Sequence, residues 1–219
     1  TYYGEEPRWI MPVVAETFDG ILNDINGLAL SEADVRAALD AASTGPVAEG
    51  NTGGGTGMIA YGFKGGTGTA SRRLEIGGNP YTLGVLVQAN HGQRDWLTIC
   101  GVPVGRHMAD DTPAGRMAER GSIIAVVATD IPMAPHQLRR VARRCTIGIG
   151  RNGTPGGNNS GDIFLAFSTA NASPLGSDSP GLRTIEMLDD SLFDQVYMAA
   201  VDCVDEAVVN AMLAAEDSG

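Results

Sequence analysis

Residues 121–144 read GSIIAVVATDIPMAPHQLRRVARR, and this stretch decides the fold. Its first part, SIIAVVATD at 122–130, is a β-branched run with too few polar positions for a strand that faces solvent on one side. It therefore predicts a strand in the middle of a covered sheet. From Pro135 to about Ile147 the apolar residues recur at helical spacing. The inward-facing positions of this predicted helix are Leu138, Val141, Ala142 and Cys145.

Further strands are predicted on both sides of this stretch. Residues 50–71 interleave glycine clusters with a β-like run at 58–63, and YTLGVLVQANHG at 81–92 continues as a buried strand with a polar tip. After a glycine- and asparagine-rich loop at 151–162, IFLAFSTAN at 163–171 predicts another buried strand. Strands and helices do not alternate regularly, so the sequence predicts an α+β fold with helices packed on sheets.

Two more helices are predicted outside this core. LALSEADVRAALDAAS at 28–43 has Ser31 as a capping residue and Asp34 at the capping-box position. The second is a long C-terminal helix beginning at a Ser191 cap. Its packing face consists of small residues: Val196, Ala199, Ala200, Cys203, Val204, Ala207, Val208 and Ala211. No internal repeat or linker interrupts the chain, so we expect residues 1–219 to form a single domain.

The composition narrows the function classes. The chain has 219 residues, 43% of them hydrophobic, which is enough for one sizeable core. Asp and Glu outnumber Lys and Arg by 26 to 15, so we expect no nucleic-acid partner. The one basic cluster is Arg139, Arg140, Arg143 and Arg144, whose helical spacing favours a solvated face or a buried ion-pair network. No apolar run approaches the length of a membrane helix, so no membrane partner is expected either.

The cysteines and histidines give no sign of a cofactor. Cys100, Cys145 and Cys203 lie far apart without CxxC or Cys/His spacing, so we expect neither a disulfide framework nor a metal site. A reducing, cytoplasmic location fits best, and a periplasmic one stays open because a removed signal leaves no trace. A histidine-based triad also stays open, since its partners can be remote in sequence. The glycine clusters lack the lysine of a phosphate-binding loop, which favours structural turns.

Gly121 and Ser122 end a polar loop at 101–121, immediately before the central strand. Such a step is ordinarily a turn. Its position also suits autoproteolysis, in which the serine hydroxyl attacks the preceding carbonyl and hydrolysis of the ester leaves a new N-terminal serine. The freed α-amine, whose pKa is ordinarily about 7.7 to 8.0, can help to take the proton from its own hydroxyl near neutral pH.

Four stretches carry a resemblance to a known family. They are GNTGGGTGMIAYGFKGGTGTASR, LVQANHG, GSIIAVVATDIPMAPHQLRRVARR and NNSGDIFLAFSTAN. Together they span most of the chain, and it resembles the L-aminopeptidase/D-esterase and β-peptidyl aminopeptidase family of self-processing N-terminal-nucleophile hydrolases. The resemblance implies a four-layer α/β/β/α sandwich of N-terminal-nucleophile type. It also implies a cofactor-free serine aminopeptidase that releases N-terminal residues (L-α, D-α or β-amino) from short peptides, amides or esters.

The resemblance further implies processing between Gly121 and Ser122. Residues 1–121 would then be the C-terminal part of a large subunit and 122–219 a small subunit. The two would associate, and such heterodimers would assemble into a homo-oligomer. A further N-terminal part of the large subunit and a short C-terminal extension, both implied by the family, have no counterpart in this sequence.

Site residues follow from the same resemblance. Ser122 would be the nucleophile, Asn90 would donate its side-chain amide to the oxyanion, and Ser160 with Asp162 would position or help to deprotonate the nucleophile. The Gly161 backbone would lie nearby.

Two further residues are expected at the substrate. Glu16 matches the carboxylate that pairs with the substrate ammonium. Phe18 stands where the family pattern leads us to expect a tyrosine, so it would line the pocket without supplying a hydroxyl.

Two other functions remain as alternatives. One is acyl transfer, as in the similarly folded ornithine acetyltransferases, although these use an N-terminal threonine and this chain has Ser122. The other is a non-catalytic structural homologue that keeps the sandwich and never cleaves itself.

Overall fold

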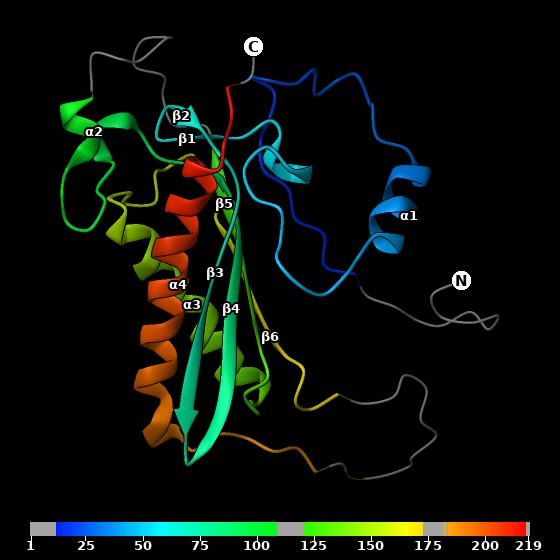
Figure 1. Ribbon diagram of the computed structural model, residues 1–219, viewed down its shortest axis with the longest axis vertical. Coiled ribbons are helices and arrows are strands. Elements are labelled where there is room, and N and C mark those ends of the chain that lie inside the picture. Colours follow the sequence, from blue (N-terminus) through cyan, green and yellow to red (C-terminus); the bar gives the residue numbers. More distant parts are fainter. Residues whose placement is uncertain (1–11, 109–120, 173–181, 183, 218–219) are drawn as a thin grey trace.

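A computed structural model describes residues 12–108, 121–172, 182 and 184–217 (Figure 1). Its centre is a four-stranded sheet in the order β3-β4-β5-β6. The strands are β3 (Gly66–Ile76), β4 (Asn79–Asn90), β5 (Ser122–Thr129) and β6 (Ile163–Ser168). β5 runs antiparallel to β4 and parallel to β6, so the predicted position of 122–130 within the sheet is confirmed.

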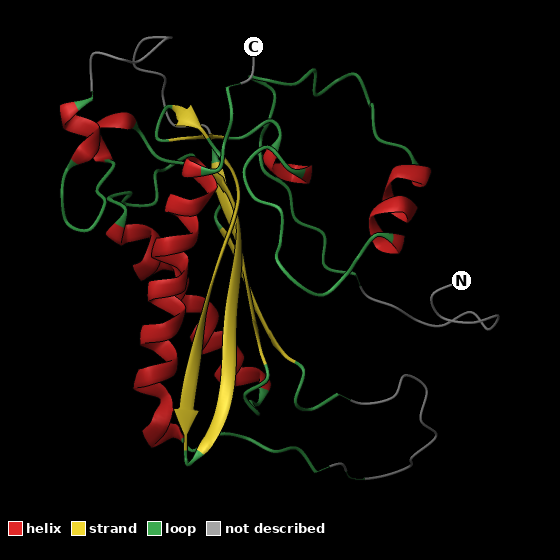
Figure 2. Cartoon of the chain, viewed as in Figure 1, coloured by secondary structure: helices red, strands yellow, loops and turns green. Residues whose placement is uncertain are grey.

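Helices α3 (Pro135–Arg151) and α4 (Phe193–Leu213) cover one face of this sheet (Figure 2). Burial alternates along the central strands. On the helix side, Leu83, Val87 and Val127 are fully buried, whereas Leu86 on the other face is 36% exposed. The expectation of a strand covered on both faces is therefore wrong for the described chain: one face carries the helices, and we call the other the open face.

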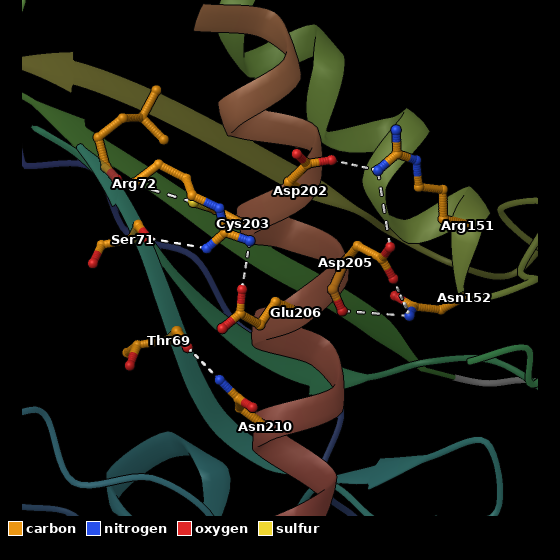
Figure 3. Close-up of polar contacts among 11 residues, drawn as sticks. Thr69, Ser71, Arg72, Arg151, Asn152, Asp202, Cys203, Asp205, Glu206 and Asn210 are labelled. Carbon is orange, nitrogen blue, oxygen red and sulfur yellow. Dashed lines mark hydrogen bonds and ion pairs between the residues drawn. The ribbon is translucent and has the colours of Figure 1, made fainter. Parts of the chain in front are cut away.

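The small residues of α4 let it lie directly on β3. All eight residues predicted for its packing face are buried. A Cβ on Gly68 of β3 would stand 2.0 Å from the carbonyl oxygen of Ala207, so only glycine fits beneath the helix. Side-chain contacts add to this packing, because Asn210 donates to the carbonyl of Thr69 at 2.8 Å and Arg72 pairs with Glu206 at 2.6 Å (Figure 3).

The arginine cluster on α3 serves the contact with α4. The guanidinium of Arg140 pairs with Asp190 and lies 4.6 Å from the ring centroid of Phe193. Arg144 lies 4.2 Å from the ring centroid of Tyr197. The Arg140–Asp190 pair is partly exposed, which agrees with the solvated-face alternative and not with a buried network; stacking on aromatic rings is an addition.

The ends of the helices differ from the sequence prediction. α3 extends to Arg151, beyond the predicted end near Ile147. Ser191 is not the N-cap of the last helix, because it lies inside a short 3₁₀ turn, η4 (Asp190–Leu192), that precedes α4. The carboxylate of Asp189 caps that turn by accepting the Ser191 backbone N–H at 2.8 Å.

Glycine-rich segments form the turns near the top of the sheet in Figure 1. β1 (Ile59–Ala60) and β2 (Phe63–Lys64) are joined by the two-residue turn Tyr61–Gly62, with φ of 53° and 71°. Tight turns join strands as predicted, but the predicted β-like run at 58–63 is wrong as a single strand, because this turn divides it into β1 and the start of β2. The short elements η1 (Gly53–Gly55), η2 (Arg94–Trp96) and α2 (Val104–His107) complete this end. Residues 109–120 of the predicted loop lie outside the described part.

Residues 12–48, which we call the N-terminal arm, stand apart from this body on the side away from α4 (Figure 1). The arm contains α1 (Glu32–Asp40), and the predicted capping interaction is present, since Ser31 N–H donates to the Asp34 carboxylate at 2.8 Å. No residue of α1 is buried, and Val35 is 58% exposed. Among the arm residues, only Thr17 is buried.

Candidate active site

The candidate nucleophile lies where the end of β4 meets the start of β5. Asn90 and Ser122 are directly opposite each other in the antiparallel register. Opposed residues of antiparallel strands project from the same face, and the alternation of burial places this pair on the open face. Both are buried, Ser122 at 9% and Asn90 at 4% exposure.

The side-chain amide of Asn90 is held in a defined orientation. Its Oδ1 accepts the backbone N–H of Ile59 at 2.8 Å, and its Nδ2 donates to the carbonyl of Phe18 at 2.7 Å. An amide nitrogen carries two donors, so within the described part of the chain one N–H of Asn90 is left for a further acceptor. The Asn90 amide is therefore pre-oriented beside Ser122.

The loop before β6 brings the predicted acidic pair to the same place. Ser160 Oγ donates to Asp162 Oδ1 at 2.6 Å, and the same oxygen accepts the Ile123 backbone N–H at 3.4 Å. A Cβ built on Gly161 would lie 4.0 Å from Ser122 Oγ, so the Gly161 backbone packs against the nucleophile. The structure thus brings Ser122, Ser160 and Asp162 together with Asn90.

Gly121 occupies a position that admits no side chain. A Cβ there would stand 1.6 Å from the carbonyl oxygen of Asn90 and 3.3 Å from the Cα of His91. Any other residue would force the β4–β5 junction apart. The glycine before Ser122 therefore has a steric reason in addition to leaving its own carbonyl uncrowded.

Phe18 and Glu16 reach the site on the arm. The Phe18 carbonyl is bound by Asn90, while its ring is 39% exposed. Glu16 is exposed, two residues before this contact. The structure thus brings the backbone of Phe18 to the site and leaves the Glu16 carboxylate in solvent.

Three residues that the sequence interpretation missed attach the arm. Gln88 Nε2 donates to Thr17 Oγ1 at 2.5 Å, and Thr17 Oγ1 donates to Met58 Sδ at 2.8 Å. Gln88 and Asn90 are two residues apart and so project from the same face of β4. Two amides at that spacing in an otherwise apolar strand were the available signal.

His91 is buried directly behind the junction. It is 2% exposed, its ring meets Tyr61 edge-on with centroids 5.1 Å apart, and neither ring nitrogen has a hydrogen-bond partner among the described residues. Burial lowers the pKa of His91 to about 4, and the Asp162 carboxylate opposes that shift. The imidazole is therefore neutral at neutral pH.

The described residues contain no cluster of three or more His, Cys, Asp or Glu side chains suited to a metal ion. None of their helices has the length and apolarity needed to cross a bilayer.

Comparison with known families identifies the family of the chain. Residues 2–219 match the family described as peptidase family S58. The chain belongs to peptidase family S58. The resemblance inferred from the sequence motifs is thereby confirmed.

Two curated relatives of this S58 chain are named beta-peptidyl aminopeptidase BapA. The protein of Sphingosinicella microcystinivorans is 48% identical over 221 residues, covering 95% of this chain and 56% of the relative. That of Sphingosinicella xenopeptidilytica is 47% identical, covering 94% and 54%. This S58 chain therefore spans about half the length of these relatives.

Solved structures give the fold of the S58 chain. It superimposes with a TM-score of 0.93 and 66% identity on the L-aminopeptidase D-Ala-esterase/amidase of Ochrobactrum anthropi, described as a variant of the Ntn hydrolase fold, covering 100% of this chain and 59% of that one. A Burkholderia sp. beta-aminopeptidase gives a TM-score of 0.87 at 46% identity, covering 97% and 60%. The α+β, N-terminal-nucleophile fold is confirmed.

Proposed function

We propose that the protein is a self-processing serine aminopeptidase whose nucleophile is Ser122, released by cleavage after Gly121. One observation carries the proposal: Ser122 opens the central strand β5 directly opposite a pre-oriented Asn90 amide, with Asp162 bonded to the neighbouring Ile123 N–H. Membership of family S58 and the names of the relatives support the same activity.

Self-processing begins with attack of Ser122 Oγ on the Gly121 carbonyl carbon. The hydroxyl proton passes to the departing Ser122 nitrogen as the C–N bond breaks, which leaves an ester and a free α-amine. Water then hydrolyses the ester, giving a Gly121 carboxylate and regenerating the hydroxyl.

Turnover uses the same atoms on a substrate. The new α-amine accepts the Ser122 hydroxyl proton, Oγ attacks the carbonyl of the first residue, and the leaving amine or alcohol takes the proton as its bond to that carbonyl breaks. Water then hydrolyses the resulting acyl-enzyme ester, which releases the first residue as a carboxylic acid and regenerates the Ser122 hydroxyl. The uncommitted N–H of Asn90 faces the developing oxyanion, a contact of a kind worth about 2.7 to 4 kcal/mol. Ser160 donates to Asp162 at 2.6 Å, and this pair positions Ser122.

The substrate is a short peptide, amide or ester with a free N-terminal amine. Glu16 pairs with the substrate ammonium, and it lies on the segment whose Phe18 carbonyl is bound by Asn90. Because this pairing requires a free N-terminal ammonium, it limits cleavage to the first residue. The relatives' names include both L-amino and β-peptidyl substrates, and the pocket shape decides between them.

The two products of processing remain associated in this proposal. β4 precedes the junction and β5 follows it, and they are paired from Leu83–Thr129 to Asn90–Ser122. α4, also after the junction, packs on β3 before it. Breaking the peptide bond therefore leaves the shared sheet and core intact.

The test uses the full-length protein with Ser122→Ala. We expect intact-mass analysis to show one uncut chain, where the wild type gives fragments ending at Gly121 and starting at Ser122. Turnover of p-nitroanilides with L-α, D-α and β³ N-terminal residues should fall about 10⁴-fold or more.

Ser71→Ala, on the exposed part of β3, is the matched control and should process and turn over like the wild type. Undiminished turnover in Ser122→Ala would remove the nucleophile assignment.

A further inference from the structure

We propose that the contact between Gln88 and Thr17 sets the substrate register, which is the distance between the ammonium-binding Glu16 and Ser122. This inference rests on the proposed function and concerns how one enzyme discriminates between α- and β-amino N-termini. Gln88 and Thr17 are positioning residues in it, since they act through Glu16.

The first step is the attachment of the arm. Thr17 is the buried residue of the arm, at 9% exposure, while α1 buries none of its own residues. Its hydroxyl lies between Gln88 Nε2 and Met58 Sδ. Among the described arm residues, Thr17 is thus the one whose side chain is held in the interior. The Phe18 carbonyl, bound by Asn90, and the residues Asp19 and Asn23, which pack against Gly57, attach the arm beside it.

The second step is that two neighbouring contacts share one strand. Gln88 binds the Thr17 hydroxyl and Asn90 binds the Phe18 carbonyl, from successive open-face positions of β4. Asn90 also faces Ser122 across the β4–β5 pair. The arm is thus held against β4, the strand that also carries the proposed oxyanion donor Asn90.

The third step is geometric. Glu16 adjoins Thr17, so fixing Thr17 limits how far the carboxylate can move from Ser122. A β-amino residue places one more carbon between its ammonium and its carbonyl, about 1.5 Å of additional chain. If the distance between Glu16 and Ser122 varies by less than this amount, the site selects one class of substrate. If it varies by more, the site accepts both classes.

The experiment compares Thr17→Val and Gln88→Leu with the wild-type full-length protein. Valine keeps the shape of threonine and removes its hydroxyl. The two substrates are the p-nitroanilides of L-alanine and β³-homoalanine. We expect KM for the preferred one to rise about 5- to 10-fold, the effect of losing one hydrogen bond, and KM for the other to change less. The ratio of kcat/KM between the two substrates should move toward one.

Two controls separate positioning from folding. Thr17→Ser keeps the hydroxyl and should restore the wild-type ratio, and Gln93→Leu, past the end of β4, should leave both substrates unaffected. Self-processing needs no ammonium contact, so intact-mass analysis should show complete cleavage in every variant.

The possible outcomes distinguish failure of this inference from failure of the proposed aminopeptidase function. An unchanged substrate ratio in both Thr17→Val and Gln88→Leu would overturn the register. The register would also be overturned if self-processing and kcat fell equally while KM stayed constant. That result would show that the contact between Gln88 and Thr17 only stabilises the fold. A wild-type protein with no aminopeptidase turnover would instead overturn the proposed function.

Discussion

The helices α4 and α1 begin in similar ways but differ in how many side chains they bury. An aspartate carboxylate accepts a backbone N–H at the start of each: Asp189 caps the 3₁₀ turn that leads into α4, and Asp34, in the first turn of α1, accepts the N–H of the N-cap Ser31. α4 buries ten of its side chains, however, and α1 buries none. Capping can start a helix, but packing of an apolar face provides most of its stability in a protein.

The same contrast holds between the whole body and the arm. The body is stabilised by a continuous core of strands β3 to β5 with α3 and α4. The arm is held to the sheet through Thr17 and the Phe18 carbonyl. Changes in the body should therefore alter the free energy of unfolding, and changes in the arm should alter substrate selection.

The largest expected effect on stability lies in the body, at Phe193. Its ring is 2% exposed and contacts both Tyr197 and the Arg140 guanidinium. We expect Phe193→Ala to lower the free energy of unfolding by about 3–5 kcal/mol, because it leaves a cavity in the core. Denaturant unfolding followed by circular dichroism measures this, and a loss below 1 kcal/mol would contradict the contrast between body and arm.

The second expected effect is a loss of stability at acid pH, caused by His91, which lies between the body and the candidate site. Folded His91 has a pKa of about 4, below its ordinary value of 6.5, so the unfolded chain binds a proton first as the pH falls. The stability that neutral His91 contributes is complete above pH 6.5 and is lost as the pH falls toward 4. We expect this loss to reach about 3 kcal/mol at pH 4.

His91→Gln should remove that loss. Its stability relative to the wild type should rise by about 3 kcal/mol between pH 7 and pH 4, as measured by urea unfolding at each pH. The exposed His136 provides the control, since His136→Gln should follow the wild-type curve. Parallel curves for His91→Gln and wild type would show that His91 titrates alike in the folded and unfolded states.

The smallest expected effect lies in the arm. Leu39 of α1 is 52% exposed, so Leu39→Ala should change the free energy of unfolding by no more than about 0.5 kcal/mol. The same unfolding measurement on the full-length protein checks this. A loss of 2 kcal/mol or more would show that another surface of the protein packs on α1, and the comparison with α4 would then fail.

The sequence predicts the body better than the arm. The 122–130 run and the small-residue face of α4 give the strand and the helix correctly, because burial imposes a local pattern on composition. The β-branched run conceals the difference between the two faces of β5, since Ile124 and Val126 are apolar although partly exposed. Ser191 was misplaced because Asp189, two residues earlier, competes for the same capping role.

The candidate site divides in the same way. Asn90 and Ser122 each end or begin a predicted strand, so their meeting follows from pairing those strands. The role of Thr17 could not be predicted, because its contact with Gln88 joins residues 71 positions apart in a segment with no periodic pattern. Contacts of this kind depend on the path of the chain in space.

The packing of α4 on β3 and β4 also determines the order in which the protein can be completed on the ribosome. The helix-side face of β4, including Leu83 and Val87, is covered by a helix that ends only at Leu213. At about 5–20 residues per second, the intervening chain takes on the order of 10 s to synthesise. The nascent hairpin of β3 and β4 therefore exposes an apolar surface for that interval, and we expect it to be a site where a chaperone binds during translation.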